Sequence, residues 1–104
     1  MILLRDYQGL EVRLTDERLE HILEHPEMTG SEGAIEETLR NSGRVLESLF
    51  DTKARLYYRF YRETAVGAKY LCVVVKITHG DAFVLTAYLT DSVKRGWRLW
   101  PETE

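Results

Sequence analysis

The stretch that decides the fold reads LYYRFY at 56–61, YLCVVVKI at 70–77 and FVLTAYL at 83–89. Each run is rich in the β-branched and aromatic residues that favour strands. The segments between the runs contain Gly67 and Gly80, as hairpin loops commonly do. The sequence therefore predicts three consecutive antiparallel strands.

Side chains alternate between the two sides of a strand, so each run divides into two faces. The apolar face, which we expect to form the core, collects Leu56, Tyr58, Phe60, Leu71, Val73, Val75, Ile77, Phe83, Leu85, Ala87 and Leu89. The opposite face collects Tyr57, Arg59, Tyr61, Tyr70, Cys72, Lys76, Thr86, Tyr88 and Thr90. Cations that meet phosphates and rings that stack on bases suit a surface that handles RNA.

The rest of the chain predicts shorter elements on either side of this meander. Residues 2–14 read as a hairpin with its turn at Gln8-Gly9, and Thr15 is a good N-cap for a helix that ends near His25, before Pro26. A second helix is expected over 33–40, a strand over 45–49, and a docked tail at the end. We expect an α+β fold in one domain, 1–104, with two N-terminal helices packed on one face of an antiparallel β-meander of about four strands. The other face would stay open for a ligand.

Charge is divided unevenly along the chain, although the formal net charge is only −3. Residues 1–52 carry five Lys and Arg against twelve Asp and Glu, whereas residues 53–100 carry nine against three. A basic sheet beside acidic helices favours an anionic ligand on one side of the molecule. Scattered solvating charges would give the same counts.

Several classes of protein have no support in the sequence. No apolar run is long enough for a membrane span, and the start is not a signal peptide, so we expect a cytoplasmic protein without membrane association. The single cysteine, Cys72, excludes an internal disulfide. Nucleotide-binding, zinc-protease and serine-hydrolase motifs are absent, and no cofactor is predicted.

The residues that can carry chemistry begin with His21 and His25, which lie at i, i+4 on the first predicted helix. Imidazole titrates near neutral pH, so it is the usual general base and acid. Cleavage of RNA without a metal also needs cations for the charged phosphorane and groups that orient the phosphate. The polar sheet face could supply these through Arg59, Lys76, Thr86 and Tyr88.

Three simpler interpretations stay open. A His-x-x-x-His pair can bind zinc, but a site needs further ligands, and we do not expect Glu24, Glu27 or the apolar Cys72 to supply them. His25 can serve only as a cation at the end of a helix, where the dipole favours it. The tyrosines of the sheet can reflect ordinary β-propensity.

The order of these motifs resembles the barnase–EndoU–colicin–RelE (BECR) nuclease superfamily, and is similar to its small phage-type and toxin-type members. The resemblance covers roughly residues 10–100 and rests on LTDERLEHILEHPE at 14–27, IEETL at 35–39, RVL at 44–46, YYR at 57–59, KYLCVVVK at 69–76 and TAY at 86–88. It implies helices packed on a four-stranded antiparallel sheet, metal-independent RNA cleavage and often a toxin–antitoxin context. The positions that match its site are His21 or His25, Arg59 or Lys76, and Thr86 with Tyr88.

We therefore expect a metal-independent endoribonuclease, the toxin of a toxin–antitoxin pair, that cleaves RNA through its 2′-hydroxyl. RNA and a cognate antitoxin protein would be its partners, and the sequence leaves a homodimer open. The alternative is a non-catalytic interaction domain that binds RNA or a protein on the open sheet face.

Overall fold

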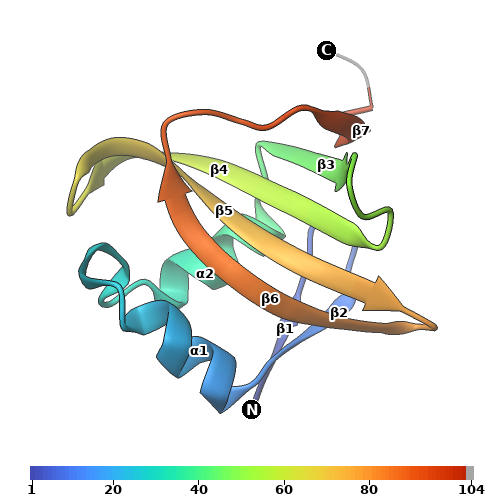
Figure 1. The fold of residues 1–104 in the computed structure, drawn as a ribbon, viewed down its shortest axis with the longest axis horizontal. Helices are drawn as coiled ribbons and strands as arrows, with labels where there is room; N and C mark the ends of the chain where they lie inside the picture. Colours follow the sequence, from blue (N-terminus) through green and yellow to red (C-terminus); the bar gives the residue numbers. More distant parts are fainter. Residues whose placement is uncertain (103–104) are drawn as a thin grey trace.

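The computed structural model describes residues 1–102, and the last two residues of the predicted 1–104 domain lie outside the described part. Figure 1 shows two helices below a strongly twisted sheet. The elements, in chain order, are β1 (Ile2–Arg5), β2 (Glu11–Leu14), α1 (Asp16–Leu23), a 3₁₀ turn η1 (Pro26–Met28), α2 (Glu32–Arg40), β3 (Arg44–Ser48), β4 (Ala54–Thr64), β5 (Gly67–Thr78), β6 (Asp81–Thr90) and β7 (Gly96–Trp100).

Within residues 1–102, seven strands form one mixed sheet in the order β1-β2-β6-β5-β4-β3-β7. The three long strands β4, β5 and β6 form the predicted meander at its centre. The N-terminal hairpin joins it through β2, which pairs parallel with β6 at Arg13 and Phe83. At the other edge, β7 pairs antiparallel with β3.

The predicted fold class, two helices on an antiparallel meander of about four strands, is therefore wrong. The physical reason is that the pairing of the predicted hairpin with β6, and the strand β7 beside β3, join segments that are far apart in the sequence. β2 and β7 are only four and five residues long, and a local pattern does not reveal such distant pairing.

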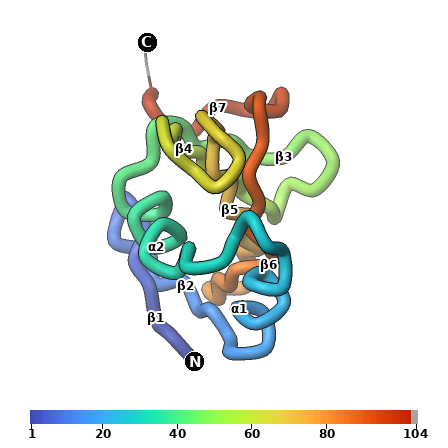
Figure 2. The backbone as a smooth tube through the Cα atoms, turned by 90° about the vertical axis from the view of Figure 1, so that its left-hand side faces the viewer, coloured from blue at the N-terminus to red at the C-terminus, as the bar shows by residue number. Residues whose placement is uncertain are grey.

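Both α-helices of the described chain cover the same face of the sheet, as the view along the strands in Figure 2 shows. The hydroxyl of Thr15 caps α1 by accepting a hydrogen bond from the Arg18 amide at 3.2 Å. Ile22 of α1 and Ile35 and Leu39 of α2 then bury their side chains against the sheet. The core on this side also contains Leu4, Val12, Leu14, Met28, Val45, Tyr57, Leu71, Val73, Val75, Ala82, Val84 and Ala87.

The opposite side, which we call the outer face, is covered as well. A second buried cluster lies there, made of Leu46, Ala54, Leu56, Tyr58, Cys72 and Val74. The chain after β6 passes over it, and Val93 packs against the cluster. The prediction that this face stays open is therefore wrong for the part that the segment 91–100 covers.

The pairing register explains why the predicted faces were mixed. Tyr57 is opposite Val73, and residues directly opposite each other point to the same side of a sheet. Tyr57, Arg59 and Tyr61 therefore face the helices, whereas Leu56 and Tyr58 lie on the outer face. On β6 the alternation is interrupted by a bulge, where the partners of Val74 and Val75 are Thr86 and Val84. No local pattern in the sequence marks this bulge.

Candidate functional site

The two histidines of the N-terminal region are solvent-exposed. The side chain of His21 is 64% exposed on α1, and its Nδ1 lies 3.8 Å from a carboxylate oxygen of Glu24. His25 stands just beyond the end of α1, where its extended backbone precedes Pro26. The ring centroids of His21 and His25 are 6.3 Å apart, with the rings nearly perpendicular. The pair therefore stays close together, although only His21 belongs to the helix.

Helix α1 runs along strand β6 (Figures 1 and 2). The guanidinium of Arg18 donates to the carbonyl oxygen of Leu85 at 3.4 Å, which ties the helix to the strand at its bulge. Within residues 1–102, strand β2 pairs with β6 only at Phe83, so beyond that point β6 has a strand partner on one side only. The helix that carries His21 thus flanks an unpaired strand edge.

Thr86 and Tyr88 lie on the outer face of β6, as the sequence predicts. Tyr88 is opposite Cys72, and its hydroxyl is buried without a hydrogen-bond partner among the described residues. Burial, followed by the neighbouring Cys72 and Tyr58, raises the pKa of Tyr88 well above its usual range. Its hydroxyl is therefore poorly placed to exchange protons with a ligand at neutral pH. Thr86 is half-buried beside it.

Arg59 does not share a face with these residues. Its Nη1 donates to the carbonyl oxygen of Asn41 at 2.8 Å, and its Nε lies 3.4 Å from a carboxylate oxygen of Glu37. Its guanidinium also lies 5.8 Å from the centroid of the Tyr61 ring. Arg59 thus fastens β4 to the C-terminal end of α2, on the helix side of the sheet.

Lys76 lies on the outer face but already has an anionic partner. Its ammonium group forms an ion pair and hydrogen bond with Asp51, in the connection between β3 and β4. The hydrogen bond from Lys76 holds the pKa of the Asp51 carboxyl below its usual range. Lys76 therefore joins β5 to this connection.

The six predicted site residues do not converge on one cleft. His21 and His25 lie together at α1, and Thr86 and Tyr88 lie together on β6. Arg59 and Lys76 lie at two other places, each with its own carboxylate.

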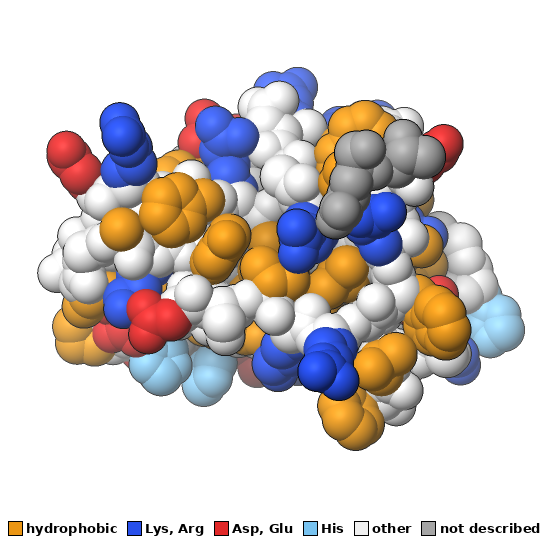
Figure 3. Space-filling model, turned by 90° about the horizontal axis from the view of Figure 1, so that it is seen from above, with side chains coloured by type: hydrophobic (Ala, Val, Ile, Leu, Met, Phe, Trp, Pro, Cys, Tyr) orange, Lys and Arg blue, Asp and Glu red, His pale blue; other side chains and the backbone are white. Residues whose placement is uncertain are grey.

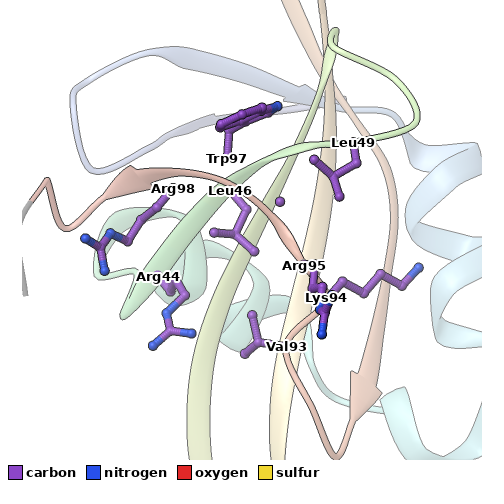
Figure 4. A pocket seen from close by; sticks show the side chains of 9 residues that line it. Arg44, Leu46, Leu49, Val93, Lys94, Arg95, Trp97 and Arg98 are labelled. Carbon is purple, nitrogen blue, oxygen red and sulfur yellow. The ribbon is translucent and has the colours of Figure 1, made fainter.

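The structure instead gathers cations in a groove that the sequence did not single out, which we call the basic groove (Figure 4). It has a volume of about 490 Å³ and is lined by Arg44, Leu46, Leu49, Val93, Lys94, Arg95, Gly96, Trp97 and Arg98. Figure 3, which looks onto the molecule from above, shows basic side chains interspersed with hydrophobic ones. The run KRGWR at 94–98, which places an aromatic residue among cations, is the signal that could have revealed it.

The basic groove adjoins the outer face of β6 through Lys94. The Lys94 ammonium lies 5.9 Å from the centroid of the Tyr88 ring, and its backbone amide donates to the Tyr58 hydroxyl at 3.2 Å. Burial raises the pKa of Tyr58 to about 12, so this hydroxyl is a neutral acceptor near pH 7. The connection from β6 to β7 is therefore held against the tyrosines of the outer face.

In comparisons with known proteins, no family model, curated protein or solved structure matches the chain significantly. Among residues 1–102, His, Cys, Asp and Glu side chains do not gather in a group of three that could hold a metal ion. Over the same residues, none of the helices is both long and apolar enough to cross a membrane.

Proposed function

We propose that this chain is a metal-independent endoribonuclease whose reaction takes place where α1 meets β6. The observation that supports this most directly is the exposed pair His21 and His25 beside the unpaired edge of β6. The rings are 6.3 Å apart, so one phosphodiester can approach both. This is the arrangement that general acid–base cleavage of RNA requires.

In the proposed reaction, His21 accepts the proton of the ribose 2′-hydroxyl, whose oxygen then attacks the adjacent phosphorus. The bond from phosphorus to the 5′-oxygen breaks, and His25 donates a proton to the leaving oxygen. The products carry a 2′,3′-cyclic phosphate and a 5′-hydroxyl.

The cations of this proposal differ from those that the sequence suggested. Arg59 and Lys76 are each bound to a carboxylate, so neither is placed for the reacting phosphate. Lys94 lies over Tyr88 on β6, the strand that α1 follows, and we assign the stabilisation of the charged phosphorane to it. This role requires the Lys94 ammonium group to reach hydrogen-bond distance of the non-bridging oxygens of the phosphate.

The biological setting belongs to the same proposal. We place the chain in the cytoplasm as the toxin of a toxin–antitoxin pair, with RNA as its substrate and an antitoxin protein as its partner. An acidic antitoxin segment would suit the basic outer side of the molecule.

A second candidate function is a non-catalytic domain that binds RNA. Its support is the engagement of Arg59 and Lys76 in ion pairs and the burial of the Tyr88 hydroxyl, which together remove three of the six predicted site groups. Binding on the outer side needs none of these three groups.

The deciding experiment is incubation of the protein with total RNA in EDTA, followed by mapping of the cut ends. We expect cleavage with 2′,3′-cyclic phosphate ends, and a loss of about 10²–10⁴-fold in His21→Gln. His79→Asn is the matched control, because it removes an imidazole from the β5–β6 turn, where φ is 44° and Asn is tolerated. Cut ends with a 5′-phosphate would contradict the mechanism, and RNA that is bound but never cut would support the second candidate.

A further inference from the structure

The basic groove is built from two parts of the chain that meet only in the folded molecule. Arg44 and Leu46 come from β3, and Lys94, Arg95 and Trp97 come from the last connection and β7 (Figure 4). The pairing of β7 with β3 brings these parts together. The groove is therefore formed by the pairing of β7 with β3 at the edge of the sheet, and not by a single segment of the chain.

Three cations of the groove, Arg44, Lys94 and Arg95, are not paired with a carboxylate in the described part of the chain. Across residues 1–102, Arg44, Lys94 and Arg95 have no carboxylate within 4.0 Å, whereas Asp51 and Asp91 are bound to Lys76 and Lys69. Glu47, opposite Trp97 on β3, does not form an ion pair with these three cations. Like charges held close together repel one another and are stabilised by an anion from solution. The groove is thus complementary to a ligand with several negative charges.

Trp97 gives the groove a second property. Its side chain is 67% exposed, although tryptophan is usually well buried, and Leu49 and Phe50 beside β3 are exposed too. The backbone of Trp97 pairs with Glu47 of β3, so its ring is carried on a strand at the rim of the groove. An accessible indole beside cations is the arrangement on which a nucleobase stacks.

From these two properties we infer that the basic groove binds a single-stranded segment of RNA, with one base stacked on Trp97 and its phosphates held by Arg44, Lys94 and Arg95. A duplex keeps its base faces inside the helical stack, so only an unpaired strand can offer one to Trp97. The inference rests on the proposed function, because it specifies that the RNA substrate is single-stranded. The RNA would run from the groove past Lys94 to α1.

The test measures binding separately from cleavage by using the His21→Gln variant as the parent protein. A fluorescein-labelled single-stranded RNA of ten nucleotides is titrated and its anisotropy recorded. We expect Trp97→Ala to weaken binding by about tenfold, within the range that loss of a stacked base produces. Trp97→Phe should retain most of the affinity. Trp100→Phe is the matched control, because Trp100 lies outside the groove against Tyr7.

The phosphate contacts are tested by the dependence of binding on salt. Arg44→Ala and Arg95→Ala should each reduce the slope of log K against log[salt] by about one, with little change between RNA sequences. Circular dichroism of each variant confirms that the fold is kept. An unchanged slope in both folded variants would overturn the assignment of these two residues to phosphates.

Other ligands provide the outcomes that would overturn the inference. If a duplex RNA of the same sequence, a poly-glutamate peptide or anionic phospholipid vesicles bound as tightly as the single strand, the groove would not be a single-strand site. Failure of the two proposals is distinguishable. Binding that depends on Trp97 without cleavage by the wild-type protein would remove the nuclease alone. Cleavage that is unaffected by Trp97→Ala and Arg44→Ala would remove the groove alone.

Discussion

At the scale of single residues, the most consequential interaction is a buried hydrogen bond between the N-terminal turn and the sheet. The hydroxyl of Tyr57 donates to a carboxylate oxygen of Asp6 at 2.8 Å, and both side chains are buried. The other oxygen of Asp6 accepts from the backbone amides of Gln8 and Leu10, each at 2.9 Å. Asp6 thus connects the β1–β2 turn to β4.

We predict that Tyr57→Phe lowers the free energy of unfolding by about 1–3 kcal/mol, because it leaves a buried carboxylate oxygen without its donor. The measurement is urea denaturation at pH 7. Tyr70→Phe is the control, since Tyr70 is half-buried and its hydroxyl makes no hydrogen bond within residues 1–102. Equal stability of the two variants would show that the Asp6 bond contributes nothing.

At the scale of elements, the structure explains both what the sequence revealed and what it did not. The strands over 56–61, 70–77 and 83–89, the hairpin turn at Gly9 and the Thr15 cap follow from local patterns, and all of them are present. The faces could not be predicted, because a register shift of one residue between β4 and β5 reverses every side chain of β4. For this reason Arg59 lies on the helix side of the sheet and not on the face where the sequence predicts it.

The same limitation applies to the candidate site. The closeness of His21 and His25 follows from their spacing in the sequence. The ion pair of Lys76 with Asp51, in contrast, depends on how the β3–β4 connection folds back, and the basic groove depends on the pairing of β7 with β3. Both features depend on contacts between segments that are far apart in the sequence, and a local pattern does not predict such contacts.

Arg59 gives a prediction that separates a structural role from a catalytic one. Because it joins β4 to Glu37 and Asn41, Arg59→Ala should lower the free energy of unfolding by about 1–2 kcal/mol. Cleavage per folded molecule should remain close to that of the wild type. Chemical denaturation and an RNA cleavage assay on the same preparations test both statements. Lost cleavage with unchanged stability would return Arg59 to the active site.

The last strand gives a second prediction about an element. A Cβ atom on Gly96 would lie 2.6 Å from the carbonyl oxygen of Glu47, so β7 could not keep its place beside β3. Gly96→Ala should therefore cost about 1–3 kcal/mol of stability and weaken RNA binding in the groove. Gly33→Ala is the control: a Cβ there meets nothing within 4 Å, and alanine favours α2. Intact binding by Gly96→Ala would show that the groove does not need this pairing.

At the scale of the whole molecule, buried tyrosines on both faces of the sheet make the free energy of unfolding depend on pH above about pH 10. Burial is the main cause that raises the pKa of Tyr7, Tyr57, Tyr58, Tyr61 and Tyr88 above the ordinary value of 10.0. In the unfolded chain these hydroxyls ionise near pH 10, whereas in the folded protein they keep their protons to higher pH. The unfolded state therefore binds fewer protons above pH 10.

It follows that stability should be constant with respect to these groups below pH 9 and should fall as pH rises from about 10 towards 12. The free energy of unfolding, measured in urea between pH 8 and pH 11.5, tests the direction. Tyr57→Phe removes one of these hydroxyls and should reduce the slope of the decline. A stability that stays level through pH 11 would contradict the assignment.

The parallel pairing of β2 with β6 also governs the order in which the molecule assembles. Arg13 and Phe83 are separated by about 70 residues, so the N-terminal hairpin has no sheet to join until the central meander exists. The meander needs only short loops and can form first, whereas distant pairing is slow. We expect the amides of β1 and β2 to acquire protection from hydrogen exchange last during refolding. The first part of the chain to be made would then be among the last to settle.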